Sequence, residues 1–85
     1  MKSFTYVITD KEGIHARPAG LVVAEAKKFA SAVTIENKGK KADLKRIFAV
    51  MSLCVKSGET IVVTCEGADE EAAAVAVEKV FKENL

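Results

Sequence analysis

The chain has 85 residues, of which 49% are hydrophobic and 29% are charged, and its formal net charge at pH 7 is +1. This length predicts one domain over residues 1–85, and the near-neutral charge argues against nucleic acid as the main partner. No stretch is long and apolar enough to cross a bilayer, and the first residues lack the apolar core of a signal peptide, so we expect a cytoplasmic protein without membrane insertion.

The first predicted element is a strand over residues 4–9, in which apolar and polar residues alternate. This alternation is typical of a half-buried strand. The residues expected on its inward face are Phe4, Tyr6 and Ile8. A polar turn at residues 10–13 then leads into the sequence Gly-Ile-His-Ala-Arg-Pro-Ala-Gly at residues 13–20.

The segment 13–20 contains the only histidine and the only proline of the chain, His15 and Pro18. A proline fits the first turn of a helix, where the N–H group that it lacks would have no partner, and the other first-turn N–H groups can bind an anion. A neutral imidazole nitrogen is a nucleophile, and the Arg17 guanidinium is two residues away. Most single histidines do no chemistry, but this combination predicts a histidine that accepts a phosphoryl group. The oxygens of that phosphoryl group would be held at the helix start, by residues Ala16, Arg17 and Pro18.

Apolar residues at helical spacing predict the first helix, and they are Ala19, Val22, Val23, Ala26, Phe29 and Ala30. Because the residue before a proline avoids the α region, Arg17 is favoured as the cap and Pro18 as the first helical residue. Strands are then expected at residues 33–36, with Val33 and Ile35 inward, and at residues 40–43. The lysines of the second suit the edge of a sheet.

Residues 46–54 predict a short helix with more apolar residues than one face can bury. The residues that could face the core are Leu44, Val50 and Leu53, and those left on the other side are Ile47, Phe48 and Met51. An exposed apolar patch on a small protein usually serves association, although these residues could also fill a corner of the core.

Residues 60–66 form the strongest strand pattern, with Ile61, Val63 and Cys65 inward. Asp69 is the expected N-cap of a last helix, whose buried stripe is Ala73, Ala76, Val77, Val80 and Phe81. The order β-α-β-β-α-β-α predicts an α+β fold, an open-faced sandwich in which three helices cover one face of a four-stranded antiparallel sheet.

The two cysteines, Cys54 and Cys65, are expected to be reduced, buried thiols that act as small hydrophobic residues. With one histidine and no close pair of cysteines, we expect neither a metal site nor a cofactor.

The sequence Gly-Ile-His-Ala-Arg-Pro-Ala at residues 13–19 resembles the active-site signature of the HPr family, the phosphocarriers of the bacterial phosphoenolpyruvate:sugar phosphotransferase system. The likeness continues in order over essentially the whole chain. The matching segments are Lys-Ala-Asp-Leu-Lys at 41–45, Val-Met-Ser-Leu at 50–53, Gly58, and Glu66-Gly67. The resemblance implies the fold described above and a first helix that starts nearer Ala16.

The resemblance also implies a function, that of a phosphoryl carrier that is not itself an enzyme. Enzyme I would donate the phosphoryl group to Nδ1 of His15, and an enzyme IIA domain would receive it. Arg17 would be a charge partner in the transfer, and Pro18 would shape the helix start. The residues implied as the docking surface for both partners are Ile47, Phe48 and Met51. We expect the carrier to be a monomer.

Three residues depart from the family pattern. Arg46 stands where many relatives have a regulatory serine, so regulation by serine phosphorylation is not expected. Cys54 replaces a small glycine, and Gly20 adds flexibility after the motif. The alternative functions are a regulatory interaction module of the same fold, which binds a transcription factor or an enzyme, and a carrier of the nitrogen-related branch.

Overall fold

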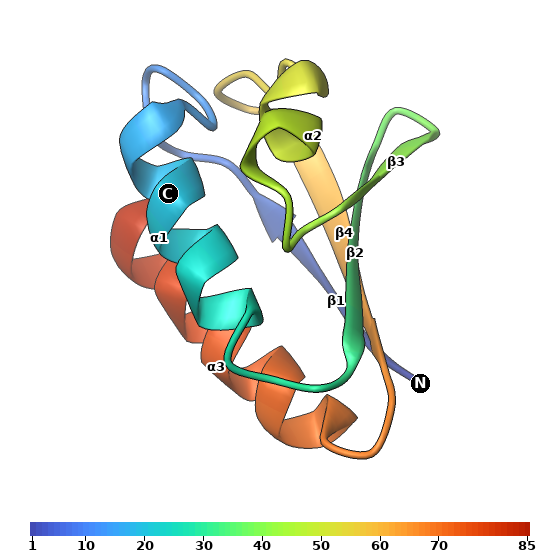
Figure 1. Ribbon diagram of the computed structural model, residues 1–85. Coiled ribbons are helices and arrows are strands. Elements are labelled where there is room, and N and C mark those ends of the chain that lie inside the picture. The colour runs from blue at the N-terminus through green and yellow to red at the C-terminus, as the bar shows by residue number, and fades with distance from the viewer.

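The computed structural model describes residues 1–85 and contains four strands and three helices in the predicted order (Figure 1). The elements are β1 (Lys2–Val7), α1 (Ala16–Ala26), β2 (Ala32–Asn37), β3 (Lys40–Asp43), α2 (Ile47–Ser52), β4 (Thr60–Glu66) and α3 (Glu70–Asn84). The predicted fold class is confirmed, because the strands form one open antiparallel sheet and the helices lie on one side of it. None of the helices has both the length and the apolar character that a membrane crossing requires.

The sheet has the strand order β1-β4-β2-β3, and every neighbouring pair is antiparallel. The central β4 pairs with both β1 and β2, so that Val63 lies opposite Phe4 on one side and Ile35 on the other. The lysine-containing β3 is an edge strand, as predicted. Lysines at an edge oppose pairing with a second sheet, because burying their charges is costly.

The hydrophobic core lies between the sheet and the helices, with α1 and α3 packed side by side in Figure 1. The inward positions predicted for β2 and β4 are buried, namely Val33, Ile35, Ile61, Val63 and Cys65. The Phe81 ring is fully buried, and the rings of Phe4 and Tyr6 pack against it with centroids 6.0 and 5.8 Å away. β1 begins two residues before its predicted start, but Ile8 just beyond it is buried as expected.

The first helix differs from the prediction at both ends. α1 begins at Ala16 with His15 as its N-cap, so the assignment of Arg17 as the cap was wrong. The residue before a proline disfavours the α region but can adopt it, and the start implied by the family resemblance is the correct one.

At its other end, α1 stops at Ala26, and the prediction that Phe29 and Ala30 continue its buried stripe was wrong. Phe29 is half-buried and Ala30 is exposed. Two distant side chains bind this segment: Lys45 Nζ donates to the Phe29 carbonyl at 2.8 Å, and Asp69 accepts the Ala30 N–H at 2.9 Å. These bonds supply partners to backbone groups outside the helix.

Asp69 occupies the predicted N-cap position of α3, but its carboxylate does not cap that helix. It accepts instead the N–H groups of Ala30 and Ser31 and the Ser31 hydroxyl. The hydroxyl, followed by the Ala30 amide, lowers the pKa of Asp69 below its ordinary value of 3.8. Asp69 therefore joins the start of α3 to the connection between α1 and β2.

The two cysteines are both free, and they differ in burial. Cys65 is fully buried, as expected, and burial raises the pKa of its thiol. The expectation that Cys54 is also buried was wrong: it is exposed and has a φ angle of 52° just after α2. There the chain turns away from the core, between the buried Leu53 and Val55.

Candidate functional site

His15 lies at the end of the segment that joins β1 to α1, and backbone hydrogen bonds fix this segment. The Gly13 N–H donates to the Asp10 carbonyl at 3.0 Å, which closes a turn. The Ile14 N–H donates at 3.0 Å to the carbonyl of Val55, which follows α2. The position of the backbone before His15 therefore depends on the connection between α2 and β4.

At Gly13 the segment before His15 lies closest to the backbone that follows α2. The φ angle of Gly13 is +69°, and a Cβ atom added there would lie 2.2 Å from the Val55 oxygen. Only glycine meets both conditions, because it has no Cβ and adopts positive φ without strain. The glycine of the motif is thus required by the packing of the backbone.

The start of the same segment is held by the last residue of the chain. The Thr9 and Asp10 N–H groups donate to the Leu85 carbonyl at 2.6 and 3.0 Å, and the Thr9 hydroxyl donates to it at 2.8 Å. Leu85 is itself buried in the core. The segment before His15 is therefore tied to the core at both of its ends.

The first turn of α1 offers backbone donors beside the imidazole. His15 is extended, with φ −108° and ψ 179°, and its side chain does not cap the helix. The first intrahelical bond is donated by Ala19 to the His15 carbonyl at 2.9 Å, and Pro18 has no N–H. The N–H groups of Ala16 and Arg17 therefore remain free at the positive end of the helix, where an anion binds favourably.

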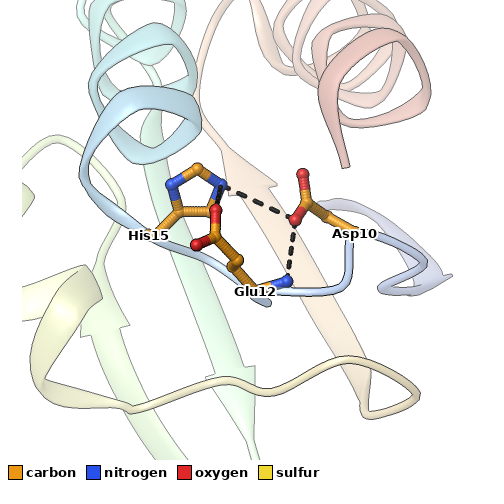
Figure 2. Close-up of side chains that lie close together, drawn as sticks. All are labelled: Asp10, Glu12 and His15. Atoms are coloured by element: carbon orange, nitrogen blue, oxygen red, sulfur yellow. Dashed lines mark hydrogen bonds and ion pairs between the residues drawn. The ribbon is translucent and has the colours of Figure 1, made fainter.

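Two carboxylates face one nitrogen of the His15 ring (Figure 2). Nε2 lies 3.6 Å from Asp10 Oδ1 and 3.6 Å from Glu12 Oε2, and 35% of the His15 side chain is exposed. These distances are too long for hydrogen bonds, but two negative charges favour the tautomer that keeps its proton on Nε2. Figure 2 shows Nδ1 directed away from both carboxylates. In that tautomer Nδ1 carries the free lone pair.

A shallow hollow of about 290 Å³ brings these groups together. Its walls are Asp10, His15, Arg17, Pro18, Leu21 and Asn84. Arg17 is exposed and forms no ion pair with any carboxylate of the chain, so its guanidinium is available to an incoming anion. The predicted residues His15, Arg17 and Pro18 thus share one hollow, and Ala16 is exposed in the same helical turn.

Asp10 and Glu12 were not predicted from the sequence as part of the site. Their segment contains only turn-forming and charged residues, and nothing in its spacing indicates where the carboxylates point. The signal that was available is the presence of two acids within five residues of the single histidine.

Apolar side chains are exposed on α2 and on the neighbouring α1. Phe48 is 85% exposed, Met51 is 36% exposed and Leu21 in α1 is 49% exposed. Ile47 was expected on the same exposed side, but it is half-buried and packs against the core, because it faces α1 at Gly20. Leu21 was not predicted as part of this surface, and it lies outside the buried stripe of α1.

Comparisons with known proteins agree with this fold. A family model described as the phosphorylation site of the PTS HPr component matches residues 2–83. The histidine-containing phosphocarrier protein of Mycoplasma has a structure 38% identical in sequence, with a TM-score of 0.95 over 96% of this chain and 93% of that one. The phosphocarrier HPr of Bacillus anthracis is 37% identical, with a TM-score of 0.86 over 93% and 94% of the two chains.

A third similar structure is that of a protein named for catabolite repression. Crh of Bacillus subtilis, described as a catabolite repression protein, is 36% identical to this chain, with a TM-score of 0.78 over 94% and 92% of the two chains. Its structure is described as a dimer formed by domain swapping.

Proposed function

This chain belongs to the HPr family of the phosphotransferase system, and we propose that it carries a phosphoryl group on His15, from enzyme I to enzyme IIA domains. A phosphocarrier role is supported by the family model and by the phosphocarrier structures that it resembles. We further propose that residues 1–85 act as one domain, that it catalyses nothing alone and that it acts in the cytoplasm as a monomer.

One observation carries the assignment of the acceptor atom. Because Asp10 and Glu12 both face Nε2, the ring proton is favoured there, and the lone pair of Nδ1 is free. Nδ1 belongs to the N-cap residue of α1, whose first-turn amides at Ala16 and Arg17 have no acceptor. The nucleophile and the donors for the phosphoryl oxygens thus come from three consecutive residues, His15, Ala16 and Arg17.

The transfer step follows from this arrangement. The Nδ1 lone pair forms a bond to phosphorus as the bond from phosphorus to the donor breaks. The Nε2 proton stays in place, so the ring becomes positively charged, and Asp10 and Glu12 stabilise that charge. The phosphoryl oxygens meet the free amides and the exposed Arg17 guanidinium. These contacts are partial or transient, which allows the group to leave again.

We propose that partners dock on the exposed apolar residues Phe48 and Met51, with half-buried Ile47 beneath them. Leu21 extends this surface, because it is exposed on α1 and also lines the hollow that contains His15. A partner that covers Leu21 therefore comes within reach of the imidazole. Burying exposed apolar area of this kind drives association.

A regulatory interaction module is the second candidate, and the likeness to Crh is the observation that favours it. In that function the docking surface binds a transcription factor or an enzyme, and His15 marks only the state of the protein. Arg46 is the N-cap of α2 and is 80% exposed, so the position that is a serine in many relatives offers no hydroxyl to a kinase. A carrier in the nitrogen-related branch would use the same chemistry with other partners.

The test is phosphoryl transfer followed by intact-protein mass spectrometry. With enzyme I and phosphoenolpyruvate, we expect one acid-labile phosphoryl group on the wild type and none on His15→Ala. Ser52→Ala is the matched control, because it removes an exposed hydroxyl on α2 and should still be phosphorylated. An acid-stable product, or a product that survives in His15→Ala, contradicts the proposal. Partner binding that is unaffected by His15→Ala, together with no transfer, supports the regulatory module instead.

A further inference from the structure

We propose that Asp10, Glu12 and His15 form a binding site for one divalent cation of the zinc class, with Asp10 Oδ1, Glu12 Oε2 and His15 Nε2 as its ligands. Each residue offers one ligand atom, and these atoms all lie within 4.8 Å of one another (Figure 2). Cation binding is an activity distinct from the carriage of a phosphoryl group.

Two of the three separations between the ligand atoms are close to those of a tetrahedral zinc site. Zinc binds imidazole nitrogen and carboxylate oxygen at about 2.0–2.2 Å, so two ligands of a tetrahedron lie about 3.3–3.6 Å apart. Nε2 is 3.6 Å from each of the two carboxylate oxygens. The two carboxylate oxygens lie within 4.8 Å of one another, and the Glu12 side chain, which is 76% exposed, is free to adjust that separation. Three protein ligands leave the fourth position to water, as in many zinc sites.

The negative charges of Asp10 and Glu12 also favour a bound cation. Asp10 and Glu12 are close to one another and to the same nitrogen, yet neither carboxylate forms an ion pair with a lysine or an arginine. One of the ligands is also fixed, because Asp10 Oδ1 accepts the Glu12 N–H at 2.9 Å. Two carboxylates and a neutral imidazole compensate the charge of a divalent ion fully.

The expectation of no metal site rested on the single histidine and the lack of a close cysteine pair. It did not consider mixed sites with carboxylates, which zinc also accepts. The convergence of two carboxylates on the imidazole is visible only in three dimensions.

Cation binding has a consequence for the ring that rests on the proposed function. A neutral imidazole has one nitrogen lone pair and one N–H. When Nε2 gives its lone pair to the cation, the proton must reside on Nδ1. Nδ1 then has no lone pair with which to form a bond to phosphorus. The bound cation and the acceptance of a phosphoryl group at Nδ1 are therefore mutually exclusive in the neutral ring.

The binding test is a calorimetric titration with zinc chloride, carried out in a Cys54→Ser background because the exposed Cys54 thiol could bind zinc itself. We expect one zinc ion per chain and a loss of affinity of about tenfold or more for Glu12→Gln and for Asp10→Asn. Glu83→Gln removes an exposed carboxylate that has no ion-pair partner and should leave the affinity unchanged. Equal affinities for Glu12→Gln and Glu83→Gln would overturn the proposal, as would a failure to saturate.

The nitrogen resonances of His15 provide a second measurement, one that does not depend on the carboxylate variants. Zinc should shift the Nε2 resonance as that nitrogen loses its proton and becomes a ligand. A shift that assigns the bond to Nδ1 contradicts the proposed ligand set.

The consequence for transfer is tested separately. Zinc should slow phosphorylation of the Cys54→Ser protein by enzyme I at least about tenfold more than it slows phosphorylation of the same protein with Glu12→Gln. Equal slowing of both would locate the effect outside this site and contradict the exclusion. A protein that binds zinc as described but is never phosphorylated would refute the proposed function and leave the cation site intact.

Discussion

The Ile14 N–H donates a hydrogen bond of 3.0 Å to the Val55 carbonyl, and this bond connects the segment before His15 to the connection that follows α2. The candidate site and the docking surface are therefore parts of one backbone arrangement. A change in the connection after α2 should therefore move the imidazole.

Gly13→Ala tests this arrangement. A methyl group at residue 13 would lie 2.2 Å from the Val55 oxygen and would impose a positive φ on alanine. We expect a loss of about 3 kcal/mol in the free energy of unfolding, measured by urea denaturation, and slower phosphorylation at the same time.

Gly39→Ala is the matched control for this change. Residue 39 also has a positive φ, +82°, but a Cβ atom there meets nothing within 4 Å. It should lose only about 1 kcal/mol from backbone strain and should accept the phosphoryl group normally. Equal losses in the two variants would show that the approach to Val55 is unimportant.

Asp69→Asn should destabilise the protein, because the carboxylate accepts three hydrogen bonds from Ala30 and Ser31 and an amide cannot accept them all. The folded pKa of Asp69 is lowered by these donors, so its contribution to stability is fully present above pH 3.8 and is lost as the pH falls through the folded pKa. The free energy of unfolding, measured from pH 7 down to pH 2, should fall less steeply in Asp69→Asn than in the wild type. Glu83→Gln should keep the steep fall, and an identical pH profile for Asp69→Asn would contradict the role of this carboxylate.

Most of the fold could be predicted from the sequence because buried apolar residues recur with the period of the strand or helix that contains them. Alternation identified β4 and its buried face, and helical spacing identified α1 and α3. The end of α1 was missed because Lys45 and Asp69, which bind the segment after it, lie 16 and 39 residues away along the chain. No local pattern records such contacts.

Only part of the candidate site could be predicted from the sequence. His15 and Arg17 are part of a local motif, and the hollow that contains both was found where the motif indicated. Asp10 and Glu12 were not predictable, because their convergence on Nε2 depends on the turn that Gly13 closes and on side-chain rotamers. Ile47 was expected with Phe48 and Met51 on the side of the helix away from the core, and its partial burial was not predicted, since the tilt of a six-residue helix cannot be deduced from its sequence.

Phe48→Ala tests the docking surface. Because Phe48 is 85% exposed, removal of its ring should change the free energy of unfolding by less than about 0.5 kcal/mol. Its loss from an interface should weaken binding to enzyme I by about tenfold, which calorimetry can measure.

Val75→Ala is the control for that experiment. Val75 is 70% exposed on α3, so its removal deletes a similar kind of exposed apolar surface at a different place. Binding should be unchanged. Should both variants bind as tightly as the wild type, the docking surface must lie elsewhere.

Arg17→Ala should slow phosphoryl transfer by about tenfold to a hundredfold without changing stability. The exposed guanidinium has no ion-pair partner in the chain, so its removal costs no internal contact but takes away a charge that the phosphoryl oxygens meet during transfer. Rapid-quench kinetics with enzyme I measure the rate. Lys79→Ala, which removes an exposed cation from α3, should transfer at the wild-type rate, and equal rates for both variants would remove Arg17 from the mechanism.

The most direct test of the central claim is a long-range proton–nitrogen NMR spectrum of His15 before and after phosphorylation. The proposed geometry predicts a proton on Nε2 and a free lone pair on Nδ1 in the unmodified protein, and a phosphorus–nitrogen coupling at Nδ1 afterwards. A coupling at Nε2, or a phosphoryl group on any residue other than His15, would contradict it.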